Sequence, residues 1–256
     1  MNCKICGHTA KLHFTVKILN EYSGEYFICP NCNFLFAGDA FWLKEAYKSA
    51  INLTDTGLVD RNIYFNKILS IFIYILFDRK GIFLDYAGGY GLFTRLMRDT
   101  GFDFFWYDPY CENLLSKGFE YNNNSKEKAE VLTAFEVFEH LENPLPEIEK
   151  MLTYSSNIFF STELLPVPIP EPENYWYYGF DHGQHISFYS PATLSFIAKK
   201  YGLKYYNLGN LHLFSTKQFS LLYLNTLKKG AKFLYPFIKK SMKSLTFEDH
   251  LKLKNK

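Results

Sequence analysis

The sequence has little net charge and no long hydrophobic run, and each shortage excludes a class of protein. Its 28 Lys and Arg and 26 Asp and Glu leave a formal net charge of +2, too small to imply a nucleic-acid partner. The longest apolar run, residues 68–77, is about half the roughly 20 residues that a membrane-spanning helix needs, and we expect a buried helix there. No apolar stretch separates Met1 from Cys3, so we expect no secretory signal and a cytoplasmic location.

What the sequence does contain is the composition of a globular protein. Hydrophobic residues make up 48% and charged residues 21% of the 256 residues. This length suits one sizeable domain with a small appendage, or two modest domains.

Four of the five cysteines form two close pairs, Cys3 with Cys6 and Cys29 with Cys32. Two such pairs are typical of a four-thiolate zinc site. Disulfides are the alternative, which a reducing cytoplasm disfavours. Since four cysteines leave no open position for water, we expect a structural zinc in a small zinc ribbon over residues 1–40.

The stretch between the two cysteine pairs has the pattern of a hairpin. Residues 13–16 and 26–28 are apolar enough to form strands. Ser23 and Gly24 predict the turn between them.

The most informative segment begins at Gly81. Residues 81–86 predict a buried parallel strand, and small residues follow at 87, 88, 89 and 91. Apolar residues at helical spacing continue to Met97. This strand, glycine loop and helix let a ligand approach the backbone closely. The next buried strand, residues 102–107, ends in Asp108, about 20 residues after the loop, where an acid can accept from ribose hydroxyls.

Further elements complete an α/β pattern. A Ser-Pro pair predicts the N-terminus of one late helix, and Gly-Asn between two apolar runs predicts a hairpin. The remaining predicted elements are strands at residues 129–135, 157–161, 203–208 and 211–215, and helices at residues 144–152 and 191–201.

Together these residues resemble the class I S-adenosylmethionine-dependent methyltransferases over roughly residues 80–216. The motif of an acid and three alternating small residues corresponds to Asp85, Ala87, Gly89 and Gly91. Residues 133–141, which include Glu139 and His140, resemble the fourth-strand motif, and residues 185–190 also recur in this family. The resemblance implies a Rossmann-like, mostly parallel seven-stranded sheet with a C-terminal antiparallel hairpin. A zinc module ahead of such a domain resembles certain bacterial sugar-modifying C-methyltransferases.

The resemblance also implies roles for the cofactor-binding residues. Asp85 would lie near the methionine end of S-adenosylmethionine, above the loop of Ala87, Gly89 and Gly91. Asp108 would hold the ribose. The remaining contacts implied are Pro109 and Tyr110 near the adenosine, and Phe135 and Glu136 on the other wall.

Four residues are candidates for the acid–base chemistry that an oxygen or carbon acceptor needs. His140, next to Glu139, is either the general base or a structural partner. For His185 we favour an anchor of the following helix, with catalysis as the alternative. His182 follows a proline-rich insertion at residues 165–172, and either contributes to catalysis or is solvated.

The predicted organisation has four parts. After the zinc ribbon come a helical cap or linker at residues 41–80 and the methyltransferase domain at residues 81–216. The segment 217–256 is basic, with nine lysines from Leu227 onward. We favour a C-terminal helix that packs its apolar side on the domain, and the alternative is a weak peripheral contact with an anionic membrane.

Three functions compete. The leading hypothesis is methyl transfer to a small-molecule acceptor, such as a sugar or sugar nucleotide in surface-polysaccharide biosynthesis. The second is an NAD(P)-dependent oxidoreductase, because Gly89, Gly91 and Asp108 also suit a nicotinamide cofactor. The third is a non-catalytic zinc-ribbon binding protein.

Overall fold

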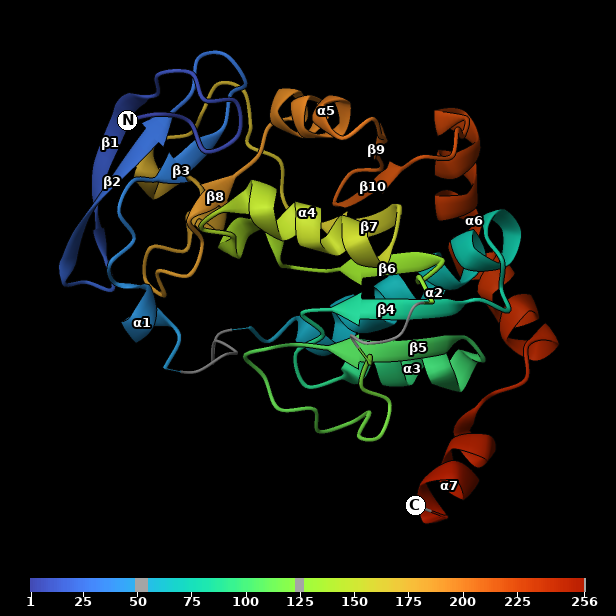
Figure 1. Cartoon of the computed structure of the whole chain (residues 1–256). Helices are drawn as coiled ribbons and strands as arrows, with labels where there is room; N and C mark the ends of the chain where they lie inside the picture. Colours follow the sequence, from blue (N-terminus) through green and yellow to red (C-terminus); the bar gives the residue numbers. More distant parts are fainter. Residues whose placement is uncertain (49–54, 123–126, 256) are drawn as a thin grey trace. The chain divides into compact units, whose positions relative to one another are not determined.

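The computed structural model describes residues 1–48, 55–122 and 127–255 of the chain (Figure 1). The part of the predicted cap at residues 49–54 lies outside these described ranges. The chain forms two compact units. The first contains residues 1–52, 135–150 and 160–216, and the second contains residues 53–134, 151–159 and 217–256.

Parallel strands with buried side chains form the centre of the second unit. β4 (Ile82–Tyr86) pairs in parallel with β5 (Asp103–Tyr107) on one side and with β6 (Val131–Ala134) on the other. All four residues of β6 are buried, as expected of a strand covered on both faces. This register places the carboxyl ends of β4 and β5 next to each other, because Asp85 is opposite Trp106.

The sheet that contains these strands has the order β5-β4-β6-β7-β10-β9. β7 is Asn157–Ser161, and β9 (Lys204–Asn207) and β10 (Leu211–Ser215) form the antiparallel hairpin predicted from the sequence. The fold is therefore α/β with a mixed sheet, as predicted.

The described part of this sheet has six strands, so the predicted count of seven is corrected. The missing strand is reduced to one parallel bridge between Trp106 and Glu120. In the part of the chain that the structure describes, two backbone hydrogen bonds hold it, from Trp106 N to Phe119 O at 2.8 Å and from Tyr121 N to Trp106 O at 2.7 Å. Gly118, at a left-handed φ of 86°, turns the chain just before the bridge, so the extended pairing cannot continue in that direction.

Helices α2 (Leu58–Leu76), α3 (Leu92–Thr100) and α6 (Leu221–Ser241) pack together in the second unit. Asn66 on α2 donates to Thr100 Oγ1 on α3 at 3.2 Å, and that hydroxyl is 3.2 Å from Tyr235 Oη on α6. The predicted buried helix at residues 68–77 is the C-terminal half of α2. α7 (Thr246–Lys254) ends the described chain.

An antiparallel sheet of order β1-β2-β3-β8 forms part of the first unit. Its strands are β1 (Lys11–Ile18), β2 (Tyr22–Ile28), β3 (Leu35–Ala37) and β8 (Ser187–Phe188). The core beside it contains Tyr26 and Trp42, which are at most 1% exposed. The Trp42 indole donates to Gly183 O at 2.9 Å, so the N-terminal strands are fixed to the segment that precedes β8.

The hairpin between the cysteine pairs is confirmed, but the predicted turn at Ser23 and Gly24 is wrong. The turn lies at Leu19 and Asn20, whose φ values of 54° and 59° are left-handed. Gly24 lies inside β2, where an added Cβ would be 2.8 Å from Ile18 Cγ1 and 3.0 Å from Trp42 Cη2. The glycine therefore allows close packing of the indole rather than a turn.

The other helices match their sequence predictions closely. α4 covers Pro144–Tyr154 and α5 covers Pro191–Lys200. Ser190 caps α5 and accepts from Thr193 N at 3.1 Å, as the Ser-Pro pair predicted. The short elements are α1 (Leu43–Ala46), η1 (Phe138–His140), η2 (Pro172–Asn174) and η3 (Trp176–Tyr178).

Candidate functional site

The loop between β4 and α3 has an unusual backbone. Ala87, Gly89 and Gly91 all have left-handed φ values, of 55°, 54° and 84°. At Gly91 a Cβ would come 2.8 Å from Asn113 Oδ1, so no other residue fits without a shift. Gly88 is equally constrained, with Asp85 Oδ2 2.7 Å from a Cβ position, and the sequence reasoning passed over it. The adjacent glycines Gly88 and Gly89 could have indicated that both positions require glycine.

Asp108, at the end of β5, is hydrogen-bonded to this loop. Its Oδ2 accepts from Gly89 N at 3.0 Å. Its Oδ1 accepts from Tyr110 N at 2.8 Å and from Cys111 N at 3.0 Å. A carboxylate has about four lone-pair sites, so these three bonds orient Asp108 and leave capacity for a ligand hydroxyl. Pro109 and Tyr110 are exposed beside it, with Tyr110 at 90%.

Unlike Asp108, whose carboxylate accepts from backbone N–H groups, Asp85 accepts from the hydroxyls of side chains. The residue is 3% exposed and accepts from Thr94 Oγ1 at 2.9 Å and from Thr133 Oγ1 at 3.0 Å. Burial raises the pKa of Asp85 to about 7. The side chain therefore ties β4 to α3 and β6. The sequence reasoning missed both threonines, since nothing in their local pattern marks them.

In the first unit the structure brings together the candidate catalytic histidines. The His140 and His185 rings are 5.0 Å apart, and the His182 and His185 rings are 4.8 Å apart. His140 Nδ1 donates to Gln184 O at 3.1 Å, which places its lone pair on Nε2. Burial lowers the pKa of His140 to about 4, so the imidazole is neutral at pH 7.

His182 and His185 differ in tautomer. His182 Nδ1 accepts from Gln184 N at 3.2 Å, and His185 Nδ1 donates to Tyr177 O at 2.6 Å. The backbone therefore fixes which nitrogen of each ring carries the proton.

Glu139 is fully buried, and neither of its carboxylate oxygens has a hydrogen-bond partner among the described residues. Burial, followed by the charge of Glu136, raises the pKa of Glu139 to about 8.

Phe135 and Glu136, predicted to contact the cofactor, directly follow β6. The Ser161 hydroxyl donates to Glu136 Oε1 at 2.6 Å. The same Ser161 Oγ accepts from Glu136 N at 2.7 Å.

The four cysteines predicted to bind zinc also lie together. The Sγ atoms of Cys3 and Cys32 are 3.6 Å apart and those of Cys6 and Cys29 are 3.4 Å apart, without a disulfide. Thiolates about 2.3 Å from a tetrahedral zinc are separated by roughly 3.8 Å, so this donor set fits the ion. The structure also attaches the second pair to α5, because Thr193 Oγ1 donates to Cys32 O at 2.7 Å.

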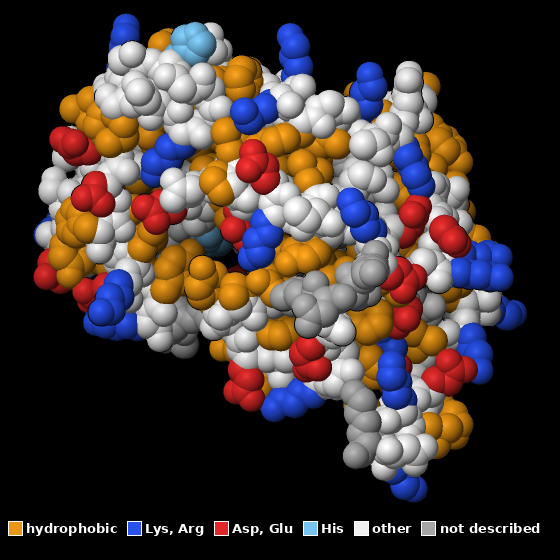
Figure 2. Space-filling model, viewed as in Figure 1, with side chains coloured by type: hydrophobic (Ala, Val, Ile, Leu, Met, Phe, Trp, Pro, Cys, Tyr) orange, Lys and Arg blue, Asp and Glu red, His pale blue; other side chains and the backbone are white. Residues whose placement is uncertain are grey.

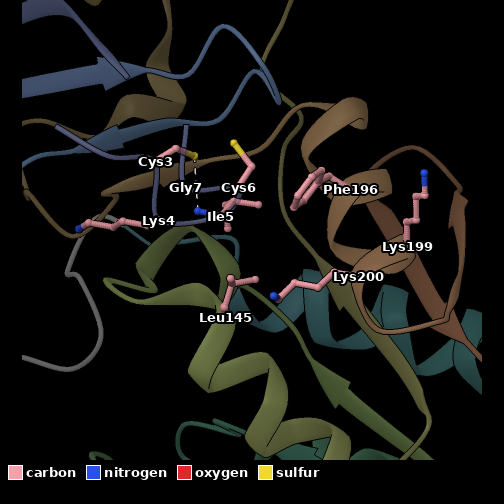
Figure 3. Close-up of a pocket in the computed structure, with 9 residues that line it drawn as sticks. All are labelled: Cys3, Lys4, Ile5, Cys6, Gly7, Leu145, Phe196, Lys199 and Lys200. Carbon is pink, nitrogen blue, oxygen red and sulfur yellow. Dashed lines mark hydrogen bonds between the residues drawn. The ribbon is translucent and has the colours of Figure 1, made fainter. Parts of the chain in front are cut away.

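A surface hollow beside the first cysteine pair is lined by three lysines and by apolar side chains, including Leu145 and Phe196 (Figure 3). Lys200 extends toward Leu145, whereas Lys4 and Lys199 point away from each other. Because the three ammonium groups do not converge, the hollow is not arranged to bind a single anion.

Comparison with solved structures finds methyltransferases at low identity. CalO1, a methyltransferase in calicheamicin biosynthesis, is 13% identical with a TM-score of 0.44, covering 68% of this chain and 59% of CalO1. The plantazolicin methyltransferase BpumL is 11% identical with a TM-score of 0.48, covering 76% of this chain and 90% of BpumL. Human N-acetylserotonin methyltransferase is 11% identical with a TM-score of 0.45, covering 68% of this chain and 64% of the enzyme.

The chain thus spans less than two thirds of CalO1 and of the human enzyme. All three TM-scores lie below 0.5, so these similarities carry no argument about the chemistry of this chain. No curated protein matches the sequence.

The family comparison is stronger. The sequence profile described as "Methyltransferase domain" matches residues 61–208, more than half of the 256 residues. The matched range includes the loop from Ala87 to Gly91, Asp108, and the cluster of Glu139, His140 and His185. The chain therefore belongs to the methyltransferase-domain family.

Proposed function

We propose that the protein transfers a methyl group from S-adenosylmethionine to a small-molecule acceptor. The observation that carries the proposal is the hydrogen bond of 3.0 Å from Gly89 N to Asp108 Oδ2, which joins the glycine loop to the acid. Membership of the methyltransferase-domain family supports the same reaction. The cofactor supplies a methyl group already activated by a sulfonium, so much of the catalysis is alignment of the reactants.

The residues of the β4–α3 loop and Asp108 would bind the cofactor. Asp108, oriented by three backbone donors, would accept from a ribose hydroxyl. The left-handed backbone at Ala87, Gly89 and Gly91 keeps side chains away from the ligand. Asp85 would support the loop through Thr94 and act on the methionine end only through its charge. The contacts of Pro109, Tyr110, Phe135 and Glu136 stay predictions.

Acceptor activation is assigned to the histidine cluster. His140 is neutral at pH 7 and has its lone pair on Nε2, so it can take the proton of an acceptor hydroxyl. Glu139 would support it as a buried acid, and the roles of His182 and His185 stay predictions. We favour a sugar or sugar nucleotide in surface-polysaccharide biosynthesis as acceptor, on the resemblance to bacterial sugar-modifying C-methyltransferases.

Calorimetric titration tests the cofactor assignment. Wild-type protein should bind S-adenosylmethionine and its demethylated product, and NADH and NADPH should give no heat. Asp108→Ala should weaken binding by at least about tenfold, or about 1.4 kcal/mol. Glu112→Ala, which removes an exposed acid of the same segment, should leave the affinity unchanged. Binding of NAD(P)H alone would indicate an oxidoreductase. No binding of any of these ligands would favour a non-catalytic binding protein.

Turnover tests the histidine cluster. His140→Ala should lower the rate of methyl transfer far more than it lowers cofactor affinity, because the residue acts on the acceptor. Equal turnover in variant and wild type would remove His140 from the mechanism.

We further propose that the four cysteines bind a structural zinc in a cytoplasmic, reducing environment. The donor set and sulfur separations support this ion. Among the described helices, none has the combination of length and apolarity needed to cross a bilayer.

For α6 we favour a helix that packs its apolar side on its own unit, and the alternative is a weak contact with an anionic membrane surface. The helix buries Leu224 and Ile238 against its own unit, but Phe233 and Phe237 are 73% and 74% exposed. The sequence of α6 contains no acid. On the face of the molecule shown in Figure 2, basic, acidic and apolar side chains are interspersed. Replacing Phe233 and Phe237 with serine should reduce co-sedimentation with anionic vesicles. Equal sedimentation with neutral vesicles would exclude this contact.

A further inference from the structure

The carboxylate of Glu139 is the feature of the first unit that points to a further ligand. The residue is 0% exposed, and both oxygens lack a hydrogen-bond partner among the described residues. The hydroxyls of Thr162 and Tyr177, which are 3.1 Å from each other, partly oppose the effect of burial on the pKa of Glu139, but burial outweighs them. A buried carboxylate without partners is costly to a fold, so its presence requires a compensating group.

Two histidines face this carboxylate. A carboxylate oxygen of Glu139 and one ring nitrogen each of His140 and His185 all lie within 4.8 Å of one another. Both rings donate Nδ1–H to backbone carbonyl oxygens, His140 to Gln184 O at 3.1 Å and His185 to Tyr177 O at 2.6 Å. This is the arrangement of metal-binding histidines, in which an outer hydrogen bond fixes the tautomer and turns Nε2 toward the ion.

We propose that Glu139, His140 and His185 form a binding site for a divalent transition-metal ion, separate from the four-cysteine site. Two imidazoles and one carboxylate suit Zn²⁺, Mn²⁺, Fe²⁺ or Co²⁺. Ligands about 2.1 Å from an ion are separated by roughly 3 to 3.5 Å, so binding draws the three side chains inward. The positive charge of a bound ion would compensate the buried carboxylate, whose oxygens have no hydrogen-bond partner among the described residues.

The ligand number distinguishes this site from the cysteine site. Four thiolates complete a tetrahedral shell and exclude substrate, whereas three ligands leave positions open. An ion with open positions can bind an acceptor that carries two adjacent oxygens, such as a vicinal diol or hydroxyketone. It would lower the pKa of the hydroxyl, and because His140 Nε2 then binds the ion instead of acting as the base, the proton passes to solvent before the oxygen takes the methyl group. This use of the ion rests on the proposed function, but binding of the ion does not.

The alternative occupant of the site is a proton. Burial raises the pKa of Glu139 to about 8, so without an ion the carboxyl is largely protonated at pH 7. The cluster would then transfer protons without a metal. The metal-bound and the protonated cluster are distinguished by the number of metal ions bound per chain.

Manganese titration of the zinc-loaded protein tests the site. One equivalent of zinc per chain is added first, which the four thiolates bind in preference to the site of two imidazoles and one carboxylate. Mn²⁺, which prefers nitrogen and oxygen donors, is then added while paramagnetic resonance measures the free ion. Wild-type protein should bind one Mn²⁺ per chain. Glu139→Gln and His185→Gln should each weaken this binding by more than tenfold.

Matched controls separate the site from its surroundings and from the proposed function. Glu163→Gln, the same change at a nearby carboxylate, should keep the Mn²⁺ site, as should His182→Gln. The metal site is overturned if wild type binds no more Mn²⁺ than Glu139→Gln, even where S-adenosylhomocysteine binds normally. Mn²⁺ binding without any binding of S-adenosylhomocysteine would instead overturn the proposed function and leave the metal site standing.

Discussion

Asp85 and Asp108 end neighbouring strands, but their surroundings differ. Asp108 receives three backbone N–H groups, which orient its carboxylate. Asp85 is enclosed, and burial raises its pKa to about 7, well above the value near 4 of an unfolded chain. The raised pKa favours the folded state below about pH 4, and this contribution is lost as the pH rises through 7.

Replacement of Asp85 by asparagine tests this difference. Between pH 5 and 8 the wild type should lose roughly 2–3 kcal/mol of unfolding free energy that Asp85→Asn does not lose. Urea unfolding of both proteins at the two pH values measures it. An equal loss in both would show that Asp85 ionises in the folded protein as easily as in the unfolded chain.

At the scale of single residues, the sequence indicated where candidate site residues lie in the chain, but not which side chains they bond to. Spacing alone marked Gly89, Gly91 and Asp108, because a turn and an acid at a strand end have local signatures. It could not identify Thr94 and Thr133, since their hydroxyls meet Asp85 only after two other elements have packed against β4. The sequence could not predict the tautomers of the histidines either, because these depend on backbone groups that the folded structure brings to each ring.

Among the elements, α7 is attached to α3 by a buried ion pair. Asp249 accepts from Arg98 at 2.6 and 2.8 Å and from Arg95 at 2.8 Å, while Arg98 and Asp249 are 3% and 4% exposed. The Arg98 guanidinium also lies 3.8 Å from the centre of the Phe119 ring. Arg98 Nη1 also donates to Asp103 and to Phe104 O, but the Nε and Nη2 groups that Asp249 accepts from would be left buried without a partner if Asp249 were removed.

Asp249→Ala should therefore lower the unfolding free energy by about 3–5 kcal/mol. Glu248→Ala, one residue earlier on the same helix, removes a half-exposed carboxylate and should change it by less than about 1 kcal/mol. Chemical denaturation of both variants gives the comparison. Similar values for the two would show that α7 is not held by the Arg98 pair.

Elements with local patterns were predicted well, and those that depend on distant pairing were not. The succession β4, α3 and β5 followed from apolar runs and glycines. The pairing of β3 with β8 joins Leu35 to Phe188, and no local pattern in either segment indicates the other. The missed turn at Leu19 and Asn20 has a similar cause, since Gly24 is required by the ring of Trp42.

At the scale of the whole molecule, the cysteine site is continuous with the rest of the first unit. Thr193 Oγ1 and Ser190 Oγ both donate to Cys32 O, at 2.7 and 3.3 Å, so the second cysteine pair is bonded to the start of α5. Loss of a metal from the thiolates would therefore disturb more than the first forty residues.

Removal of zinc should lower the thermal midpoint and expose Trp42, which is 1% exposed in the folded protein. Tryptophan fluorescence during heating, with the metal content measured before and after chelation, checks this. Cys111→Ser, which changes the cysteine outside both pairs, should keep both the metal and the midpoint. A midpoint that does not move after complete removal of zinc would contradict a structural role.

The pairing of β3 with β8 also sets an order of events during synthesis. β1, β2 and β3 leave the ribosome long before Ser187 and Phe188 exist, about 150 residues later, so the N-terminal sheet stays one strand short for most of translation. During that interval the exposed edge of β3 is a template for pairing with other chains. A zinc ion bound early by Cys3, Cys6, Cys29 and Cys32 would hold the three strands in register until the fourth arrives.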